Sequence, residues 1–438
     1  MKKVWVYADF DWLKDIELIG ELSCELLRGS ETYGFQFSND WLKKYGELFL
    51  SEDLNNYPGS QYTRQGRDIF GCFSDALPDR WGRVLLNRRE QLMAAEEKRP
   101  VNRLNSFDYL VGIDDFSRMG GFRFKENPEG EFINTSNKLR IPPLTAIRDL
   151  MYASQEIEKS EELNLLPDKK WLIQLIQPGT SLGGARPKAS VTDERGILYI
   201  AKFPSRKDDY DVGLWEHFCH LLAAKAGIRV ASTRVLVTEN KYHTLLSERF
   251  DRRNDGKRIH FASAMTLTGL TDGANAATGN GYLDIVDFII QGCTNVEANL
   301  QELYRRVAFN ICVGNTDDHF RNHGFLLTPR GWTLSPAYDM NPTLNNQQSL
   351  LISESSCESD LVILIDACEN YMLSRDTAEK IISEVVDAMK DWRRIAIRLN
   401  ISKREIDLFS QRFDTYSSFG CKSEAQAVLG RQLIKATP

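Results

Sequence analysis

The stretch Val313-Gly-Asn-Thr-Asp-Asp-His-Phe-Arg-Asn-His-Gly324, followed by Pro336-Ala-Tyr-Asp-Met340, decides how the rest of the sequence is interpreted. Asp317 and Asn322 lie five residues apart in it, and Asp339 follows. Phosphoryl transfer needs one carboxylate to orient the attacking hydroxyl, and an amide and a second carboxylate to hold Mg²⁺ on the nucleotide phosphates. The order of these three side chains therefore predicts an ATP-dependent phosphotransferase.

The spacing of these residues matches one class of such enzymes. Asp-x₄-Asn is the spacing of a protein-kinase catalytic loop, and the later aspartate takes the place of the metal-binding residue of the Asp-Phe-Gly motif. Asp317 is the predicted catalytic residue, and Asn322 and Asp339 are the predicted Mg²⁺ ligands through hard oxygens. Asp318 is a rival for Asp317, although it lies only four residues from Asn322.

Two histidines in the same loop allow another interpretation. His319 and His323 stand four residues apart, as a pair of zinc ligands can, but no third ligand falls at an obvious spacing. A histidine in a phosphate-handling loop is more often a packing or phosphate contact. We therefore expect His319, and Tyr338 beside the predicted metal ligand, to contact ATP.

A glycine-containing segment precedes a short predicted strand. In Ser181-Leu-Gly-Gly-Ala-Arg-Pro-Lys188, the adjacent glycines let backbone N–H groups approach phosphate oxygens, and two basic residues add positive charge. Taken alone, the segment is better explained as a simple turn between strands, because short glycine motifs are weak evidence. As a phosphate loop, it would contact ATP through Gly183, Gly184, Ala185, Arg186 and Lys188.

Three further groups follow in the order that a kinase requires. Lys202, on the next predicted strand, would bind the nucleotide phosphates, and Glu216, near the start of the following helix, would hold that lysine. Taken singly, a solvated strand lysine and a helix-N-terminal glutamate are the simpler interpretations. Glu248-Arg-Phe-Asp251 stands where a kinase chain crosses between lobes, so Glu248 and Phe250 are expected beside the adenine.

The pattern along the chain predicts an α+β, bilobal kinase-like fold. Strands are expected at 4–7, 197–203, 233–238 and 242–248, and helices at 81–97, 214–226 and, as one apolar stripe, 381–395. Asp376 followed by Glu379 gives the last helix a candidate capping box. The predicted division is an N-terminal α/β subdomain at 1–125, a turn-rich linker at 126–144, a β-rich small lobe at 145–255 and an all-α large lobe at 256–438, with ATP in the cleft between the lobes.

Composition narrows the class of protein further. A net charge of −6 argues against autonomous binding to a nucleic-acid backbone. The basic residues from Arg249 to Arg258 are interleaved with Asp251 and Asp255, which predicts a solvated surface of mixed charge. No stretch approaches the ~18 apolar residues needed to cross a bilayer, and the eight dispersed cysteines lack metal-ligand spacing. We therefore expect a cytoplasmic protein with reduced thiols and no membrane contact.

Several stretches together resemble the HipA family of toxin kinases. Phe73–Gly82 resembles the family's Leu-Pro-Asp segment, Leu110–Gly121 its following Asp…Gly motif, and Ser181–Lys188 its phosphate loop. The hinge, catalytic loop and metal loop of the family are matched in combination by Ser247–Arg253, Asn315–Asn322 and Pro336–Asp339.

The resemblance implies a serine/threonine protein kinase of a type II toxin–antitoxin system that arrests growth, a route to persistence, by phosphorylating a component of translation such as an aminoacyl-tRNA synthetase. It also implies autophosphorylation on Ser181, with Thr180 as the alternative acceptor. The partner it implies is a small helix-turn-helix antitoxin resembling HipB, through which alone the complex would reach DNA.

Two other functions stay open. His319 gives Asp-x-His-x-x-Asn, which is closer to lipid kinases than to eukaryotic protein kinases, so a small-molecule or lipid-type kinase is the first alternative. The second is a catalytically inactive, kinase-like regulatory subunit of a DNA-binding complex. An intact set of Lys202, Asp317, Asn322 and Asp339 argues against the second.

Overall fold

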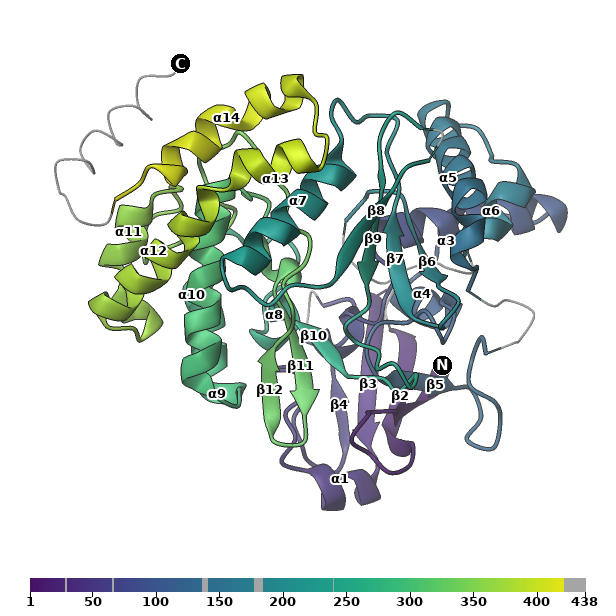
Figure 1. Ribbon diagram of the computed structural model, residues 1–438. Helices are drawn as coiled ribbons and strands as arrows, with labels where there is room; N and C mark the ends of the chain where they lie inside the picture. Colours follow the sequence, from purple (N-terminus) through teal and green to yellow (C-terminus); the bar gives the residue numbers. More distant parts are fainter. Residues whose placement is uncertain (28–29, 65–66, 136–140, 177–183, 239, 421–438) are drawn as a thin grey trace. The chain divides into compact units, whose positions relative to one another are not determined.

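A computed structural model of the chain describes residues 1–27, 30–64, 67–135, 141–176, 184–238 and 240–420 (Figure 1). These residues form two compact units built from interleaved segments. The first comprises Met1–Asp209, Arg234–Leu270 and Phe325–Trp332, and the second comprises Tyr210–Thr233, Thr271–Gly324 and the described chain from Thr333 onward. The mixture of helix and sheet confirms the predicted α+β class, whereas the predicted four-part division stays a prediction.

The first unit begins with an antiparallel five-stranded sheet. Its order is β4 (Ser60–Tyr62), β3 (Ser30–Phe37), β2 (Glu17–Leu27), β1 (Lys2–Ala8) and β5 (Phe122–Lys125). In β1, Val4, Val6 and Ala8 are buried and alternate with more exposed residues, which is the two-residue period of a half-buried strand. The predicted strand at 4–7 is therefore confirmed.

A second sheet carries the segments predicted to bind phosphate. It has the order β6 (Lys188–Thr192), β7 (Leu198–Lys202), β9 (Thr244–Glu248) and β8 (Thr233–Leu236), with β6–β7 and β7–β9 antiparallel. A third sheet has the order β10 (Phe261–Ser263), β11 (Gly324–Thr328) and β12 (Gly331–Leu334).

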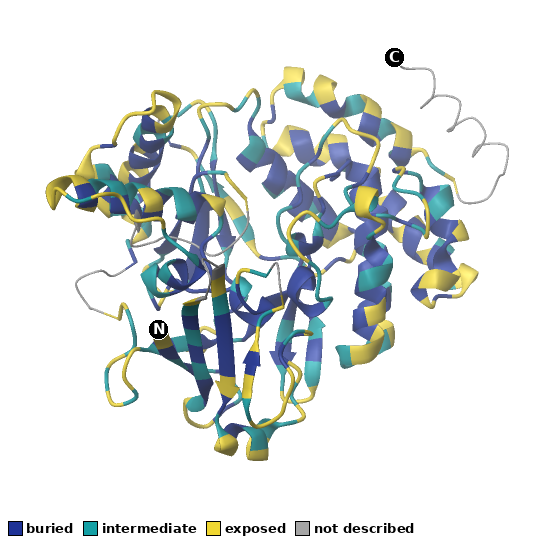
Figure 2. Ribbon diagram, turned by 180° about the vertical axis from the view of Figure 1, so that it is seen from behind, coloured by how far each residue is buried: buried dark blue, intermediate teal, exposed yellow. Residues whose placement is uncertain are grey.

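Helices pack an apolar core against the second sheet. Leu150 and Ile157 of α5 (Ile147–Glu162), Leu175 of α6 (Lys169–Ile176) and Trp81 of α3 (Arg80–Glu96) share one buried cluster with Val191 of β6. Burying each such side chain contributes about 1.5–3 kcal/mol. In Figure 2 these strands are largely dark blue, while yellow gathers on the outer faces of helices and on loops. The remaining helices of this unit are α1 (Asn39–Tyr45), α2 (Gly71–Ser74), α4 (Ser106–Gly112), η2 (Leu144–Ala146) and α8 (Ala264–Leu267).

The second unit is largely helical. Its helices are α7 (Val212–Lys225), η3 (Ala276–Thr278), α9 (Tyr282–Gly292), α10 (Val296–Val313), η4 (Phe320–Asn322), α11 (Leu361–Asp366), η5 (Cys368–Tyr371), α12 (Arg375–Met389), α13 (Trp392–Arg398) and α14 (Lys403–Ser417). The expected helix at 214–226 is α7, and Gly227, whose φ is positive, follows its C-cap Ala226.

The apolar stripe predicted as one helix is divided in two. α12 ends at Met389 and α13 begins at Trp392, so the single helix was wrong although all seven stripe residues are buried. The predicted capping box was also wrong, because the hydroxyl of Ser374 caps α12 by accepting from the N–H of Thr377. Burial periodicity continues across the break because both helices contact α7 and α14, so periodicity alone did not reveal it.

Two further expectations concern the chain as a whole. Within the described ranges, no helix has both the length and the apolar character that crossing a bilayer would require. No disulfide joins the seven cysteines that the structure describes.

A buried histidine lies at the centre of the first unit. The ring of His260 stacks on Phe10 at 4.7 Å between centroids and lies 4.2 Å from Phe122 and 5.6 Å from Trp332. Burial lowers its pKa to about 3, which the charge of Asp251 opposes only weakly. The imidazole is therefore neutral in the folded protein at neutral pH.

This histidine should make the chain less stable in mild acid. Its folded pKa lies below the unfolded value, so the unfolded chain takes up a proton that the folded chain does not. As the pH falls from about 6.5 towards about 4.5, this one group should reduce the free energy of unfolding by about 1.4 kcal/mol per pH unit. In urea unfolding, His260→Asn should lack this pH dependence of the free energy of unfolding. Phe35→Leu, a core change away from His260, should lower the free energy of unfolding but keep its pH dependence. Equal slopes for wild type and His260→Asn would contradict the prediction.

One glycine ends the helix that leads into the predicted catalytic loop. Gly314, at the C-cap of α10, has φ +72°, the left-handed region that favours glycine. A Cβ placed there would lie 2.6 Å from the carbonyl oxygen of Thr343. A side chain at this position would therefore have to displace the segment after Asp339.

Alanine at this glycine should cost more than alanine at a glycine of similar φ. Gly279 has φ +80°, and no described atom lies within 4 Å of the point that a Cβ would occupy, so Gly279→Ala measures backbone strain alone, about 1 kcal/mol. Gly314→Ala adds a steric clash and should lower the free energy of unfolding by roughly 2–4 kcal/mol. Chemical denaturation of both variants checks the difference, and equal losses would show that the clash is relieved without cost.

Candidate active site

The predicted catalytic loop follows α10 in the second unit. Asp317 is exposed, whereas Asn322, at the end of η4, is buried. The amide nitrogen of Asn322 donates to the carbonyl oxygen of Asp317 at 3.1 Å. Because the nitrogen makes this bond, the amide oxygen is the atom of Asn322 suited to a metal ion. The loop thus presents a carboxylate to solvent and fixes the amide five residues later.

Asp318 lies in a different environment from its neighbour. It is buried, and its Oδ2 accepts from the hydroxyl of Tyr282 at 2.7 Å and the amide of Asn310 at 2.6 Å, and contacts Nε2 of His323 at 2.7 Å. Burial opposes its ionisation, but the charge and hydrogen bond of His323 and the bond from Tyr282 outweigh burial and lower its pKa. Asp318 therefore ties α9, α10 and the end of the loop together, and exposure favours Asp317 for contact with a substrate.

The two histidines of the loop lie in different surroundings. His323 is buried against Asp318, and His319 is half-buried. Among the residues that the structure describes, no group of three or more His, Cys, Asp or Glu side chains is arranged to hold a metal ion. His323 thus has a structural contact, and the predicted contact of His319 with ATP stays a prediction.

The second predicted metal ligand lies on a loop that is hydrogen-bonded to the first. Asp339 has φ +58°, an uncommon conformation for a residue other than glycine. The hydroxyl of the adjacent Tyr338 donates to the carbonyl oxygen of Arg321 at 2.6 Å, which joins this loop to η4 beside Asn322. The predicted catalytic and metal loops are therefore held to each other within one unit.

A run of asparagines extends this connection into the core. Asn341 donates from its amide to Asp339 at 3.4 Å and from its backbone to Oδ1 of Asn315 at 3.4 Å. Asn315 donates to Asn310 at 3.1 Å, and Asn310 donates to Asp318. Sequence analysis missed all three asparagines, although Asn341 stands two residues after a predicted metal ligand, which could have singled it out.

The donor set at these loops fits Mg²⁺. Asn322 and Asp339 offer amide and carboxylate oxygens, the hard ligands that Mg²⁺ prefers. Oδ1 of Asn341 is buried and has no hydrogen-bond partner among the described residues, while the nitrogen of the same amide bonds Asp339. An unsatisfied oxygen beside a carboxylate is the environment that a hydrated cation would satisfy.

The phosphate-loop segment lies in the first unit, and part of it is described. Thr180, Ser181 and Gly183 lie outside the described residues. Gly184 has φ +80°, and the guanidinium of Arg186 makes two bonds to Asp208, at 2.9 and 2.6 Å. Arg186 is therefore clamped to the loop that follows β7.

Lys188 makes a contact that the sequence did not predict. It is buried, and its ammonium lies 2.8 Å from Asp79 and 3.3 Å from the carbonyl oxygen of Gly184. Asp79 caps α3 through the N–H of Gly82, and the indole of Trp81 donates to the carbonyl oxygen of Lys188 at 3.1 Å. Lys188 thus anchors the segment to α3, and its predicted contact with ATP stays a prediction.

The predicted lysine and glutamate lie on the expected elements. Lys202 is the last residue of β7, half-buried and paired in register with Lys188 and Leu245. Glu216 lies in α7, buried, with His220 4.0 Å away. Because Lys202 belongs to the first unit and Glu216 to the second, the ion pair between them stays a prediction.

The hinge segment is held by buried charges. Arg249 and Asp251, both fully shielded, form an ion pair with two contacts of 2.6 Å, and Asp251 also accepts from the N–H of Gly120 at 2.8 Å. Glu248, by contrast, is half-buried at the end of β9, and Phe250 packs near Phe261 at 5.9 Å between centroids. The hinge backbone is therefore fixed to the loop before β5, while the adenine contacts of Glu248 and Phe250 stay predictions.

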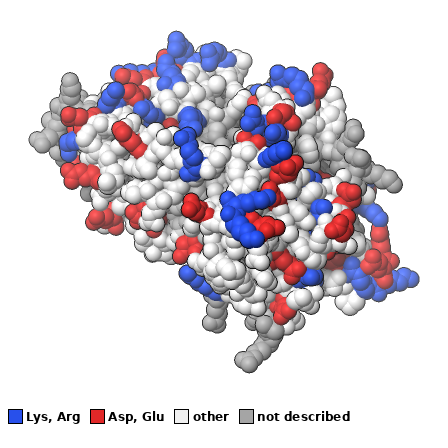
Figure 3. Space-filling view, turned by 90° about the horizontal axis from the view of Figure 1, so that it is seen from below, with Lys and Arg blue, Asp and Glu red and all other residues white. Residues whose placement is uncertain are grey.

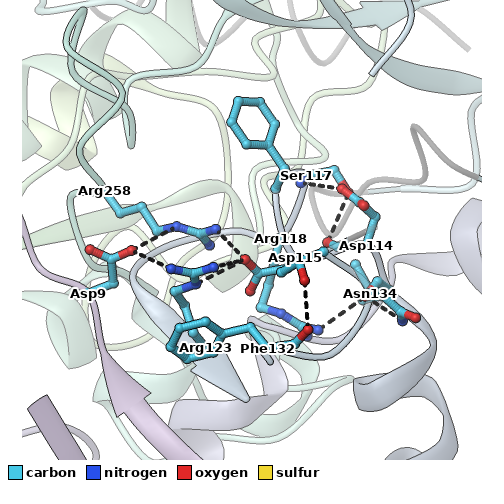
Figure 4. Close-up of polar contacts among 12 residues, drawn as sticks. Asp9, Asp114, Asp115, Ser117, Arg118, Arg123, Phe132, Asn134 and Arg258 are labelled. Atoms are coloured by element: carbon cyan, nitrogen blue, oxygen red, sulfur yellow. Dashed lines mark hydrogen bonds and ion pairs between the residues drawn. The ribbon is translucent and has the colours of Figure 1, made fainter. Parts of the chain in front are cut away.

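The charge pairs continue towards the N-terminus (Figure 4). Asp115 contacts Arg123 at 2.7 Å and Arg258 at 2.9 Å, and Asp9 lies within 3.5 Å of the same two arginines. Charges and hydrogen bonds from these arginines lower the pKa of Asp115 although burial opposes them. Burial also lowers the pKa of Arg252 to about 9, although Asp251 opposes this shift.

This network corrects one expectation from the sequence. Arg249, Asp251 and Arg258 are buried, so the predicted solvated surface holds only for Arg253, Asp255 and Lys257. Arg249 and Asp251 neutralise each other two positions apart, whereas the counter-charge of Arg258 is Asp115, 143 positions away, which local sequence does not reveal. On the face shown in Figure 3, basic and acidic side chains lie interspersed.

Comparison with known proteins identifies relatives over most of the chain. The family model described as the HipA-like C-terminal domain matches residues 180–393. The serine/threonine-protein kinase toxin HipA of Shewanella oneidensis MR-1 is 27% identical over 349 residues, which cover 74% of this chain and 72% of that protein.

A solved structure agrees in fold. HipA of the same organism, determined in a complex with HipB and operator DNA, aligns with a TM-score of 0.62 over 96% of this chain and 98% of its own, at 18% identity. At that identity the match shows a shared fold and nothing further. The family model, the sequence relative and the shared fold agree with the resemblance drawn from the motifs: residues 180–393 match the HipA-like C-terminal domain, and the chain is similar to a HipA serine/threonine-protein kinase over most of its length.

Proposed function

We propose that the chain transfers the γ-phosphoryl group of ATP to a serine or threonine hydroxyl of a protein, and that it does so as a growth-arresting toxin. One observation carries the proposal. An exposed Asp317 and a fixed Asn322 lie on a loop that is hydrogen-bonded to the loop of Asp339, within one compact unit. These are the groups, in the order, that protein kinases use.

Each side chain has a role in the proposed reaction. Asp317 accepts the hydrogen bond of the attacking hydroxyl and aligns its oxygen with the γ-phosphorus. Lys202 binds phosphate oxygens and stabilises the charge that spreads over them during transfer. Asn322 and Asp339 would hold Mg²⁺, with Asn341 beside them, and the ion would neutralise charge on the β- and γ-phosphates. Asp318 does not react; it holds the loop in place.

The names of the relatives support a toxin with a HipB-like partner, and the family resemblance supports the target. The sequence relative is named a toxin, and the solved relative was determined with HipB and operator DNA. We propose a cytoplasmic toxin that phosphorylates a translation component such as an aminoacyl-tRNA synthetase. Its partner would be a helix-turn-helix antitoxin resembling HipB, and the net charge of −6 agrees with contact to DNA only through that partner.

Self-modification is part of the same proposal. Ser181, or Thr180 next to it, would be the acceptor, in a segment that carries glycines suited to phosphate binding. A phosphate there adds roughly −1.5 to −2 charges, which would repel the phosphates of ATP. The modified enzyme would therefore be switched off.

Incubation with Mg²⁺ and γ-labelled ATP, followed by mass spectrometry of the full chain and of a lysate, tests this function. Label should appear on Ser181 or Thr180 and on a protein of the lysate. Asp317→Asn should reduce transfer at least ~100-fold with unchanged stability, while Asp376→Asn, an exposed change at the start of α12, should not reduce it. Label confined to small molecules or lipids would favour the lipid-type alternative, and transfer that survives Asp317→Asn would refute the assigned role.

The neighbouring aspartate should behave in the opposite way. Asp318→Asn removes a buried charge that Tyr282, Asn310 and His323 all contact, so it should lower the free energy of unfolding by about 3 kcal/mol. Asp317→Asn should change that free energy by less than about 0.5 kcal/mol, as expected at an exposed site. Urea unfolding of the two variants distinguishes the roles, and similar stabilities would contradict the structural role of Asp318.

A further inference from the structure

A cavity of about 950 Å³ lies in the first unit, outside the residues assigned to catalysis. Three separate segments line it: the start of α5, the loop after β7 and the turn between β8 and β9. Each contributes one basic side chain and two contribute a tyrosine. The residues that define the cavity are Arg148 and Tyr152, Arg206 and Asp208, and Lys241 and Tyr242.

The charge of the lining favours an anion. Arg148, Arg206 and Lys241 converge from three segments and are exposed, and the lining acids are Asp149 and Asp208. Arg206 lies 3.6 Å from Glu162, with both side chains well exposed, which is a weak pair that a ligand can replace. Asp208 is already neutralised by Arg186. The three basic side chains therefore outnumber the two lining acids, although Glu158 also lies beside the cavity and accepts from Ser205 and from the N–H of Arg206.

The aromatic side chains favour a planar ring as part of that anion. Tyr152 packs edge-on against Trp171 at 5.0 Å between centroids, which holds its ring in place while half of the side chain stays exposed. Tyr242 accepts a hydrogen bond from Lys241 at 2.8 Å. Held tyrosine faces stack on nucleobases, and neighbouring cations bind the phosphate. Ligand sites of small molecules span about 300–1,000 Å³, so a nucleotide fits in size.

The cavity is also connected to the segments proposed to bind ATP. Asp208 lines the cavity and holds Arg186, two residues after Gly184, by two hydrogen bonds. It also accepts from the N–H of Ser205, which lies three residues after Lys202. A ligand that contacts Asp208 or Arg206 would thus change the contacts of both proposed phosphate-binding segments.

From this arrangement we propose that the cavity is an effector site for a nucleoside monophosphate or diphosphate. The ligand's phosphate would meet Arg148, Arg206 and Lys241, and its base would stack on Tyr152 or Tyr242. Through Asp208 and Arg186, its occupancy would change the affinity of the enzyme for ATP. Binding of the ligand does not depend on the proposed function, and only its effect on ATP affinity rests on that function.

Calorimetric titration of the full chain with guanosine 5′-monophosphate, in the presence of Mg²⁺ and saturating non-hydrolysable ATP analogue, tests the binding step. One equivalent should bind, and Arg206→Glu and Tyr152→Ala should each weaken binding at least tenfold. Lys207→Glu, the same charge change on the exposed neighbour outside the cavity, should leave affinity within twofold. Thermal unfolding of each variant should match wild type.

Several results would overturn the site. The first is that the monophosphate does not bind. The second is that Arg206→Glu and Lys207→Glu lose equal affinity for it. The third is that inorganic phosphate binds with equal affinity, which would show that the base makes no contribution. A poly-glutamate peptide that binds in an Arg206-dependent way while the monophosphate does not would make the cavity a docking site for acidic peptides instead.

The coupling step has its own measurement. The monophosphate should shift the dissociation constant of the ATP analogue at least threefold in wild type, and the analogue should shift that of the monophosphate by the same factor. Asp208→Asn should bring both shifts to within about 1.5-fold. Arg206-dependent binding without any shift would overturn the effector role alone. If the kinase assay failed while this binding persisted, the proposed function would fall and the site would stand.

Discussion

The carboxylate of Asp318 is the contact on which the arrangement of the second unit depends. A buried carboxylate is costly unless hydrogen bonds replace its hydration, and here a tyrosine hydroxyl, an asparagine amide and an imidazole do so. These three groups come from α9, from α10 and from the end of the proposed catalytic loop. Because Asp318 is immobilised, its neighbour Asp317 faces solvent on a loop with little freedom. A rigid carboxylate at a fixed position is what alignment of a hydroxyl requires.

In the first unit, buried charged groups are stabilised by ion pairs instead. Arg249 and Asp251 are fully shielded, and each has partners beyond the other, on Ser117 and Gly120. Pairs of this kind add little net stability compared with apolar packing, but removing one member leaves a buried charge. The hinge is therefore held in one conformation by contacts that are specific rather than strong. Asp115 extends the same arrangement to Arg123 and Arg258.

Local order in the sequence was enough to find the motifs and the fold class. The Asp317, Asn322 and Asp339 spacing is contained in short segments, and β1, α3 and α7 were expected from local composition or periodicity. The partners of charged residues could not be found in this way. Nothing near Lys188 indicates that Asp79 lies beside it, and nothing near Arg258 indicates Asp115. Long-range pairing decides whether a lysine or arginine faces solvent, a ligand or a buried carboxylate, and one sequence does not encode that pairing in any local pattern.

The pairing of Lys188 with Asp79 has a consequence for how the chain can be divided. The family model starts at residue 180, which suggests a self-sufficient module. Excised there, that module would lose the carboxylate that pairs with the Lys188 ammonium and the indole that bonds the Lys188 carbonyl. The stretch matched by the family model is thus smaller than the set of residues that these contacts hold together. Recombination near residue 180 would separate the charge of Lys188 from its partner Asp79. We therefore expect the N-terminal segment and the module after it to be inherited as one gene.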